Sequence, residues 1–205
     1  MIAYVETNFI LKLALQQRER AACETLLELA ASGRVRLVVP ACSLSEPYDT
    51  LGRHRQLRRE LQQDFMRTLD QMERSEQFAA RAESLRVEVT ALLGASYDTE
   101  RQSLDEVVRR VLDVAEVIPL TREVHAAALA NRESRHLSPP DALVHASVVS
   151  HLSVAPAGAK AFLTRDADFD NPDIVAELEG NDCRLIGRFD QGLSFIRHVL
   201  GAERT

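Results

Sequence analysis

Five acidic residues stand at comparable points of the chain, either just after a short apolar run or at the start of a helical pattern. They are Glu6, Glu46, Asp141, Asp166 and Asp168. In an open parallel sheet, ligands bind beyond the carboxyl ends of the strands, so acids that follow strands meet at one edge. Carboxylates gathered in this way repel one another unless a divalent cation with oxygen ligands holds them together. The spacing therefore predicts a metal site at one edge of a sheet.

Each acid also has a structural explanation that requires no metal. Two of them complete capping-box patterns, Ser43-x-x-Glu46 and Ser138-x-x-Asp141. Asp166 or Asp168 would form an Asx-turn after a strand, and Glu6 would suit the positive end of a helix dipole. Taken singly, the capping patterns favour caps. Several such acids at one predicted edge favour the metal site, and both explanations stay open at this point.

The elements that must place these acids follow from the apolar periodicity. Short apolar runs predict strands at residues 2–5, 35–39, 114–120, 161–164 and 183–186. Amphipathic or capped segments predict helices at residues 9–17, 19–31, 43–51, 53–81, 83–93, 100–112, 124–132, 139–152 and 189–200. Short strands that alternate with helices indicate a parallel sheet covered by helices on both faces. We therefore expect an α/β fold.

The middle of the chain, at about residues 53–116, has no strand signal. We expect it to form a helical insertion within a single domain that spans residues 1–205. Its first helix carries apolar residues on one stripe, at Leu57, Leu61, Phe65, Leu69 and Met72. This spacing predicts a long amphipathic helix, and residues 94–99 are expected to form the turn between the two helices that follow.

The overall composition limits the class of protein. The chain has 205 residues, 45% of them hydrophobic and 27% charged, which suits one soluble domain with a substantial core. Its net charge of −6 argues against a polycationic nucleic-acid binder but leaves open nucleic acid that is held through metal ions. No apolar run approaches the roughly 18 residues of a membrane span, so we expect a cytoplasmic protein without a membrane segment. The three widely spaced cysteines are expected to be buried thiols.

One short segment, residues 53–59, is basic and contains no acid. Its arginines are Arg53, Arg55, Arg58 and Arg59. These side chains would suit an RNA backbone that passes next to the acidic site. The equally open alternative is an exposed helix start whose charges face Glu60 and Asp64. Because tryptophan is absent and tyrosine is scarce, a base-stacking binder of the OB or RRM type is disfavoured.

Four segments together resemble a known family. They are Tyr4-Val5-Glu6-Thr7-Asn8, Leu44-Ser45-Glu46, Pro140-Asp141-Ala142-Leu143-Val144-His145-Ala146 and Phe162-Leu163-Thr164-Arg165-Asp166-Ala167-Asp168-Phe169. The set is similar to the PIN domain, a family that includes VapC-type toxin ribonucleases. The resemblance covers residues 1–51 and about 114–200, and the helical middle section has no counterpart in the smallest toxins.

The resemblance implies a three-layer α/β/α sandwich with about five parallel strands, in which the central first strand presents the first acid. It also implies Mg²⁺- or Mn²⁺-dependent cleavage of RNA. Carried over residue by residue, the catalytic acids are Glu6, Glu46, Asp141 and Asp166, the metal ligands are Glu6, Asp141, Asp166 and Asp168, and the supporting residues are Asn8 and Thr164. His145, four residues after Asp141, shares its helix face and is expected to pack in the core or to support the metal ligands from behind rather than to bind the metal.

The implied chemistry suits these residue types. Hard oxygen ligands select Mg²⁺ or Mn²⁺, which lower the pKa of a bound water and neutralise charge on a phosphoryl group. Glu6 departs from the family, whose members usually have aspartate at this position. The extra methylene moves the carboxylate outward by about one bond, which would shift or weaken a metal with demanding octahedral geometry.

Three questions of function therefore stay open on the sequence. The leading hypothesis is a metal-dependent ribonuclease, and the alternative is a catalytically inactive PIN-like module that binds RNA or a protein. A toxin role predicts a small antitoxin partner over the acidic cleft. The chain length and the helical section are equally consistent with a stand-alone or differently regulated enzyme. A homodimer is expected from the family only. Nucleotide-binding motifs of the Walker or Rossmann type are absent from the sequence.

Overall fold

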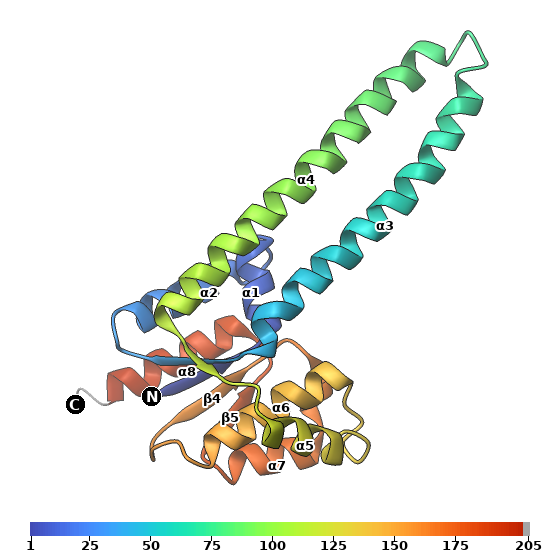
Figure 1. The fold of residues 1–205 in the computed structure, drawn as a ribbon. Coiled ribbons are helices and arrows are strands. Elements are labelled where there is room, and N and C mark those ends of the chain that lie inside the picture. Colours follow the sequence, from blue (N-terminus) through green and yellow to red (C-terminus); the bar gives the residue numbers. More distant parts are fainter. Residues whose placement is uncertain (203–205) are drawn as a thin grey trace.

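The computed structural model describes residues 1–202, and its centre is a five-stranded parallel sheet (Figure 1). The strands are β1 (Ile2–Val5), β2 (Arg36–Pro40), β3 (Glu116–Ile118), β4 (Lys160–Leu163) and β5 (Cys183–Ile186). Their spatial order is β3-β2-β1-β4-β5, so β1 lies in the middle. All four strand pairs are parallel. The five predicted strands and the α/β class are confirmed.

Helices cover both faces of the sheet. One face carries α1 (Thr7–Ala14), α2 (Arg20–Ala31), α8 (Phe189–Ala202) and the end of α4 (Ala79–Val114). The other face carries α5 (Arg122–Asn131), α6 (Pro139–Leu152), the 3₁₀ turn Ala167–Asp170 and α7 (Pro172–Glu179). Figure 1 shows the two helical layers with the sheet between them. The three-layer α/β/α arrangement is therefore confirmed, although α7 was not predicted.

The alternation of side chains along β1 explains why the sheet is buried on both faces. Ala3 and Val5 belong to the core on the α1 side, whereas Ile2 and Tyr4 belong to the core on the α6 side. Each of these four side chains is at most 5% exposed. Strands buried on both faces form continuous apolar runs, as this one does. The first polar side chain after the run is Glu6, which therefore marks the carboxyl end of the central strand.

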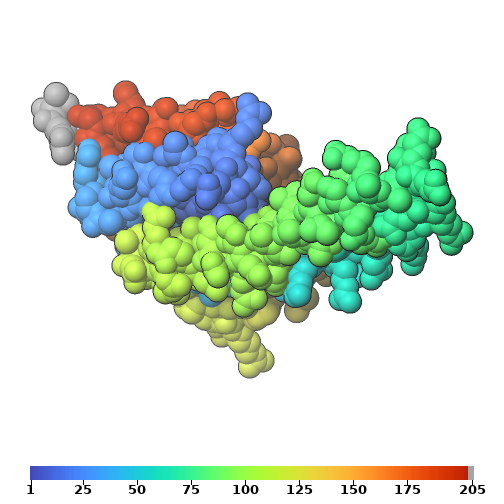
Figure 2. All heavy atoms as spheres, turned by 90° about the horizontal axis from the view of Figure 1, so that it is seen from above, coloured from blue at the N-terminus to red at the C-terminus, as the bar shows by residue number. Residues whose placement is uncertain are grey.

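The long helices α3 (Cys42–Met72) and α4 form an antiparallel hairpin that projects from the sheet and its covering helices. Figure 2 shows the outer part of this hairpin extending well beyond the rest of the molecule. We call residues 53–100 of the hairpin the arm, and the remainder the body. Within the arm, only Leu69 and Ala82 are buried. The arm thus has little core of its own.

Two predicted boundaries in this region are wrong. The helices predicted at residues 43–51 and 53–81 are one helix, α3, and the chain turns at residues 73–78. The turn predicted at residues 94–99 does not exist, because α4 is continuous from Ala79 to Val114. A glycine inside a helix costs about 1 kcal/mol relative to alanine. Packing of α4 against α3 outweighs that cost at Gly94.

The apolar stripe on α3 is only partly buried. Leu69 is 1% exposed, but Leu57 and Leu61 are 63% and 69% exposed, and Met72 is 40% exposed. The periodicity correctly predicts a helix, but α4 covers only one side of it. No helix in the described part of the chain has the length and hydropathy needed to cross a membrane.

Candidate metal centre

Glu6 lies at the carboxyl end of the central strand and caps the next helix. Its side chain is 4% exposed, and Oε2 accepts a hydrogen bond from the backbone N–H of Asn8 at 2.7 Å. Oε1 accepts a hydrogen bond from the hydroxyl of Thr164 at 3.1 Å. Burial raises the pKa of Glu6 from 4.5 to about 7, although both hydrogen bonds favour the charged form. The nearby Asp166 contributes further to this rise.

Thr164 joins the first and fourth strand ends. The register that pairs Val5 with Leu163 places Thr164 next to Glu6. The Thr164 hydroxyl donates to Glu6 and accepts from the backbone N–H of Asp166 at 3.0 Å. Asp166 in turn accepts from the backbone N–H of Asp168 at 3.0 Å, which is the Asx-turn expected as an alternative. One hydroxyl therefore fixes two loops that carry acids.

Glu46 is held by a residue that the sequence reasoning missed. Its Oε2 accepts a hydrogen bond from the Thr7 hydroxyl at 2.5 Å, so α3 is tied to the start of α1. The capping box expected from Ser43-x-x-Glu46 is wrong, because the helix begins two residues earlier and its N-cap is Ala41. Thr7 could have been found from its position, since it directly follows the first acid after β1.

Asp141 lies in the first turn of α6, and here the capping pattern is real. Ser138 is the N-cap, and its hydroxyl accepts from the backbone N–H of Asp141 and donates to the Asp141 carboxylate. Burial raises the pKa of Asp141, and the negative charges of Asp166, Glu46 and Asp168 raise it further. These charges act on Asp141 because the structure brings the acids from four separate segments toward one another. Asp141 therefore takes part in the cap of α6 and also belongs to the acidic group.

The acidic group is not neutralised by basic side chains. Within residues 1–202, no ion pair involves Glu6, Glu46, Asp141, Asp166 or Asp168. Arg165, the nearest basic residue in sequence, turns away: its Nη1 donates to the carbonyl of Gly187 at 2.9 Å, and its Nε lies 3.7 Å from Glu19. We call these five carboxylates the acidic edge.

The chemistry of the acidic edge suits a hard divalent cation. Every donor is an oxygen, the set carries several negative charges, and the Glu6 carboxylate is buried. Among the described residues, no three His, Cys, Asp or Glu side chains lie close enough to hold a metal ion by themselves. Mg²⁺ commonly uses one or two carboxylates and completes its shell with waters and substrate phosphates. The donor set therefore fits such an ion.

His145 lies one turn after Asp141 and serves packing rather than the acidic edge. It is 3% exposed, and its Nε2 is 3.1 Å from Glu177 Oε2, which also pairs with Arg135 at 2.6 Å. Burial lowers the pKa of His145, while Glu177 opposes that change. This cluster ties α6 to α7 and to the loop before Ser138.

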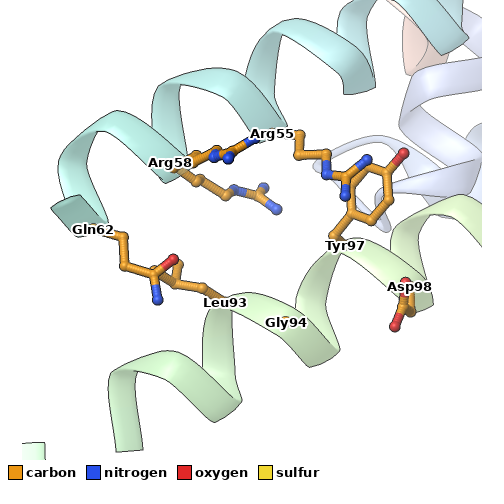
Figure 3. Close-up of a pocket in the computed structure, with 8 residues that line it drawn as sticks. Arg55, Arg58, Gln62, Leu93, Gly94, Tyr97 and Asp98 are labelled. Atoms are coloured by element: carbon orange, nitrogen blue, oxygen red, sulfur yellow. The ribbon is translucent and has the colours of Figure 1, made fainter. Parts of the chain in front are cut away.

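The basic segment of α3 points mostly toward α4. Arg55, Arg58 and Arg59 line a pocket of about 350 Å³ in the arm together with Tyr97, as Figure 3 shows for the labelled residues. Arg58 forms two hydrogen bonds with Glu100, at 2.7 and 2.9 Å, and Arg55 stacks on the Tyr97 ring at 4.3 Å. Because α-helical residues advance about 100° each, only Arg53 shares the face of Glu46. The pocket thus belongs to the arm.

Comparisons with known proteins identify the fold family. The PIN domain family matches residues 4–169, which is well over half of the chain and includes all five acids of the acidic edge. One similar solved structure is VapBC2 from Rickettsia felis, bound to a DNA fragment from their promoter, with 13% sequence identity and a TM-score of 0.43. That similarity covers 91% of this chain and 98% of the other. No curated protein matches the chain. The chain belongs to the PIN domain family.

Proposed function

We propose that this protein is a metal-dependent endoribonuclease that hydrolyses phosphodiester bonds in RNA at the acidic edge. The observation that carries the proposal is the convergence of carboxylates from four chain segments without a basic partner within residues 1–202. Grouping like charges destabilises a fold, so such a group is retained where a cation compensates it. Membership of the PIN domain family supports a nuclease over other uses of a divalent ion.

The proposed roles follow from the contacts of each acid. Of Glu6, Asp141 and Asp166, one or two would hold Mg²⁺ or Mn²⁺ directly and the rest would act through bound waters, with Asp168 at the exposed rim. Glu46, oriented by its hydrogen bond from Thr7, would bind the ion or orient the attacking water. Thr164 and the backbone of Asn8 hold the Glu6 carboxylate in place. When bound, the cation would supply an acidified water and neutralise negative charge on the phosphoryl group.

The experiment that tests the proposal compares wild type with Asp141→Asn on labelled RNA in Mn²⁺. Asparagine keeps an oxygen that accepts from Ser138, so the cap survives while the charge is lost. We expect cleavage to fall at least about 100-fold, because even indirect metal-site changes often cost 10- to 100-fold. Glu179→Gln, a matched loss of an exposed carboxylate at the end of α7, should leave cleavage unchanged.

Two outcomes contradict the enzyme. Wild type that binds RNA but cuts none of it, with or without Mn²⁺, is the inactive module suggested by the glutamate at position 6. Cleavage that is equal in wild type and Asp141→Asn would come from a contaminant or another site. An antitoxin partner over the acidic edge and a cytoplasmic location stay predictions of the sequence, and co-purification with a small basic protein tests the former.

A further inference from the structure

The pocket between the two helices of the arm is not used by the nuclease proposal. It has a volume of about 350 Å³, and we call it the arm pocket. Figure 3 shows Arg55 and Tyr97 at the end nearer the body. Gln62 and Leu93 lie at the outer end, with Arg58 between the two ends. Pockets that hold small molecules in proteins begin at about this size, so the arm pocket has room for one small ligand.

The charges that line the arm pocket favour an anion. Three arginines line it, Arg55, Arg58 and Arg59, against one acid, Asp98. Arg58 is neutralised by Glu100, to which it donates two hydrogen bonds. Neither Arg55 nor Arg59 forms an ion pair within residues 1–202. The pocket therefore keeps a positive charge in a chain whose net charge is −6, and guanidinium groups bind phosphate oxygens well.

A flat stacking surface lies beside these charges. The Arg55 guanidinium lies over the Tyr97 ring, 4.3 Å from the ring centroid. Nucleobases stack on aromatic rings and on guanidinium planes. Because this planar surface and the unpaired arginines line one pocket, the ligand that suits both is a planar ring that carries a phosphate group. A nucleotide has both parts.

Gly94 leaves the α4 side of the arm pocket without a side chain. A Cβ atom added at this position would meet no atom within 4 Å. Gly94 lies in the interior of α4 and is not among the residues with positive φ, so neither close packing nor a left-handed backbone requires glycine there. Glycine in a helix interior is less stable than leucine or alanine. What the glycine does provide is open space between α3 and α4.

We propose that the arm pocket binds a nucleotide, with its phosphate held by Arg59 and its base stacked against Arg55 and Tyr97. The ligand is either a free nucleotide or one nucleotide unit of an RNA strand, since both present these groups. The site is separate from the acidic edge. At about 100° and 1.5 Å per residue, Arg55 lies on the opposite side of α3 from Glu46 and about 13 Å farther along its axis.

The test measures binding by isothermal titration calorimetry in EDTA, where metal-dependent cleavage does not take place. The probes are adenosine monophosphate, uridine monophosphate, a four-nucleotide RNA and inorganic phosphate. We expect a nucleotide probe to bind at least about tenfold more tightly than inorganic phosphate, because the base adds stacking to the ionic contact. Binding of a monophosphate identifies a free nucleotide as the ligand, whereas binding of the RNA alone identifies a nucleotide unit of a strand.

Two variants locate the binding in the arm pocket, each with a matched control. Gly94→Leu fills the open space and favours the helix, so it should fold and lose at least about tenfold in affinity. Gly52→Leu makes the same change in open space on α3 outside the pocket and should bind as wild type does. Arg59→Gln should weaken binding and reduce its dependence on salt, whereas Arg81→Gln, at an exposed position of α4 outside the pocket, should do neither.

Three outcomes overturn the proposal. They are the absence of binding to every nucleotide probe, inorganic phosphate that binds as tightly as the nucleotides, and equal affinity of Gly94→Leu and Gly52→Leu. Circular dichroism checks that each variant is folded, and the comparison of Arg59→Gln with Arg81→Gln decides the matter if Gly94→Leu does not fold. Because binding is measured without metal, none of these results depends on RNA cleavage at the acidic edge, and either proposal can fail while the other holds.

Discussion

The acidic edge and the arm are both rich in charged side chains, but only in the arm do acids pair with arginines. In the arm, acids and arginines meet across the two helices: Arg58 pairs with Glu100 at 2.7 Å, and Arg86 pairs with Asp70 and Glu73 at 2.6 Å. At the acidic edge, carboxylates from four segments act on one another electrostatically, and none of them forms an ion pair among the described residues. The two regions therefore differ in whether the charges are compensated within the chain.

This difference separates structural charges from functional ones. Pairs across α3 and α4 align two helices that have little apolar core, and each contributes modestly because the side chains are still partly open to solvent. Carboxylates without a basic partner destabilise the fold instead, because their mutual repulsion and their burial oppose folding. Carboxylates that stay uncompensated by a basic side chain are candidates for binding something that the chain does not contain, even where they also cap helices.

The strongest test of this comparison concerns Glu6. Its pKa is about 7 in the folded protein and 4.5 when unfolded, so the folded state binds more protons between these values. Stability is therefore full below pH 4.5 and falls as the pH rises to about 7, by about 3 kcal/mol in total. Glu6→Gln should abolish this loss. Urea unfolding of both proteins in EDTA, between pH 5 and pH 8, measures it.

The same series contains its own control. Glu179→Gln removes an exposed carboxylate at the end of α7 and should follow the wild-type pH profile. If Glu6→Gln and wild type lose stability in parallel as the pH rises, the burial of a charged carboxylate at position 6 is not what destabilises the metal-free protein.

An arginine placed at the acidic edge should neutralise part of its negative charge, as the arginines of the arm do for the acids there. Asp168→Arg puts a guanidinium at the exposed rim, next to the charges that raise the pKa of Asp141. We expect Mn²⁺ affinity to fall about tenfold and the melting temperature of the metal-free protein to rise. Calorimetric titration with Mn²⁺ measures the first effect. Glu179→Arg, the same charge change on α7, should leave both unchanged, and equal losses in the two variants would point to net charge alone.

The smallest expected effect lies in the arm. Arg86→Ala removes the contacts to Asp70 and Glu73 that close the end of the hairpin. Amide exchange should quicken around residues 70–90, while the melting temperature changes by less than about 2 °C. Hydrogen exchange followed by mass spectrometry resolves the two regions. Arg74→Ala, in the turn, serves as the matched control, and faster exchange throughout the body would show that the arm and body unfold together.

The sequence was informative where local pattern and tertiary structure agree. The runs at residues 2–5 and 161–163 are apolar because both faces of each strand are covered, so these strands were predictable. Glu6, Asp141 and Asp166 stood out as candidates because Glu6 directly follows β1, Asp141 lies in the first turn of α6, and Asp166 comes three residues after β4. Topological reasoning then placed them at one edge.

The failures have a common physical cause, which is that a pattern does not specify what packs on it. Leu57 and Leu61 have helical spacing, but α4 lies on another side of α3. Ser43 and Glu46 have the spacing of a capping box, but α3 begins at Cys42, so Ser43 is already inside the helix. Thr7 was missed because its contact with Glu46 joins residues 39 positions apart.

The continuity of α3 has a mechanical consequence. Glu46 lies in its second turn and Met72 at its far end, about 40 Å away along the axis, with no break in the helix between them. A helix is stiff along its length, so tilting the outer end shifts the Glu46 carboxylate relative to Thr7. A partner that binds the outer end of α3 would therefore also change the distances between the Glu46 carboxylate and the other oxygens of the acidic edge.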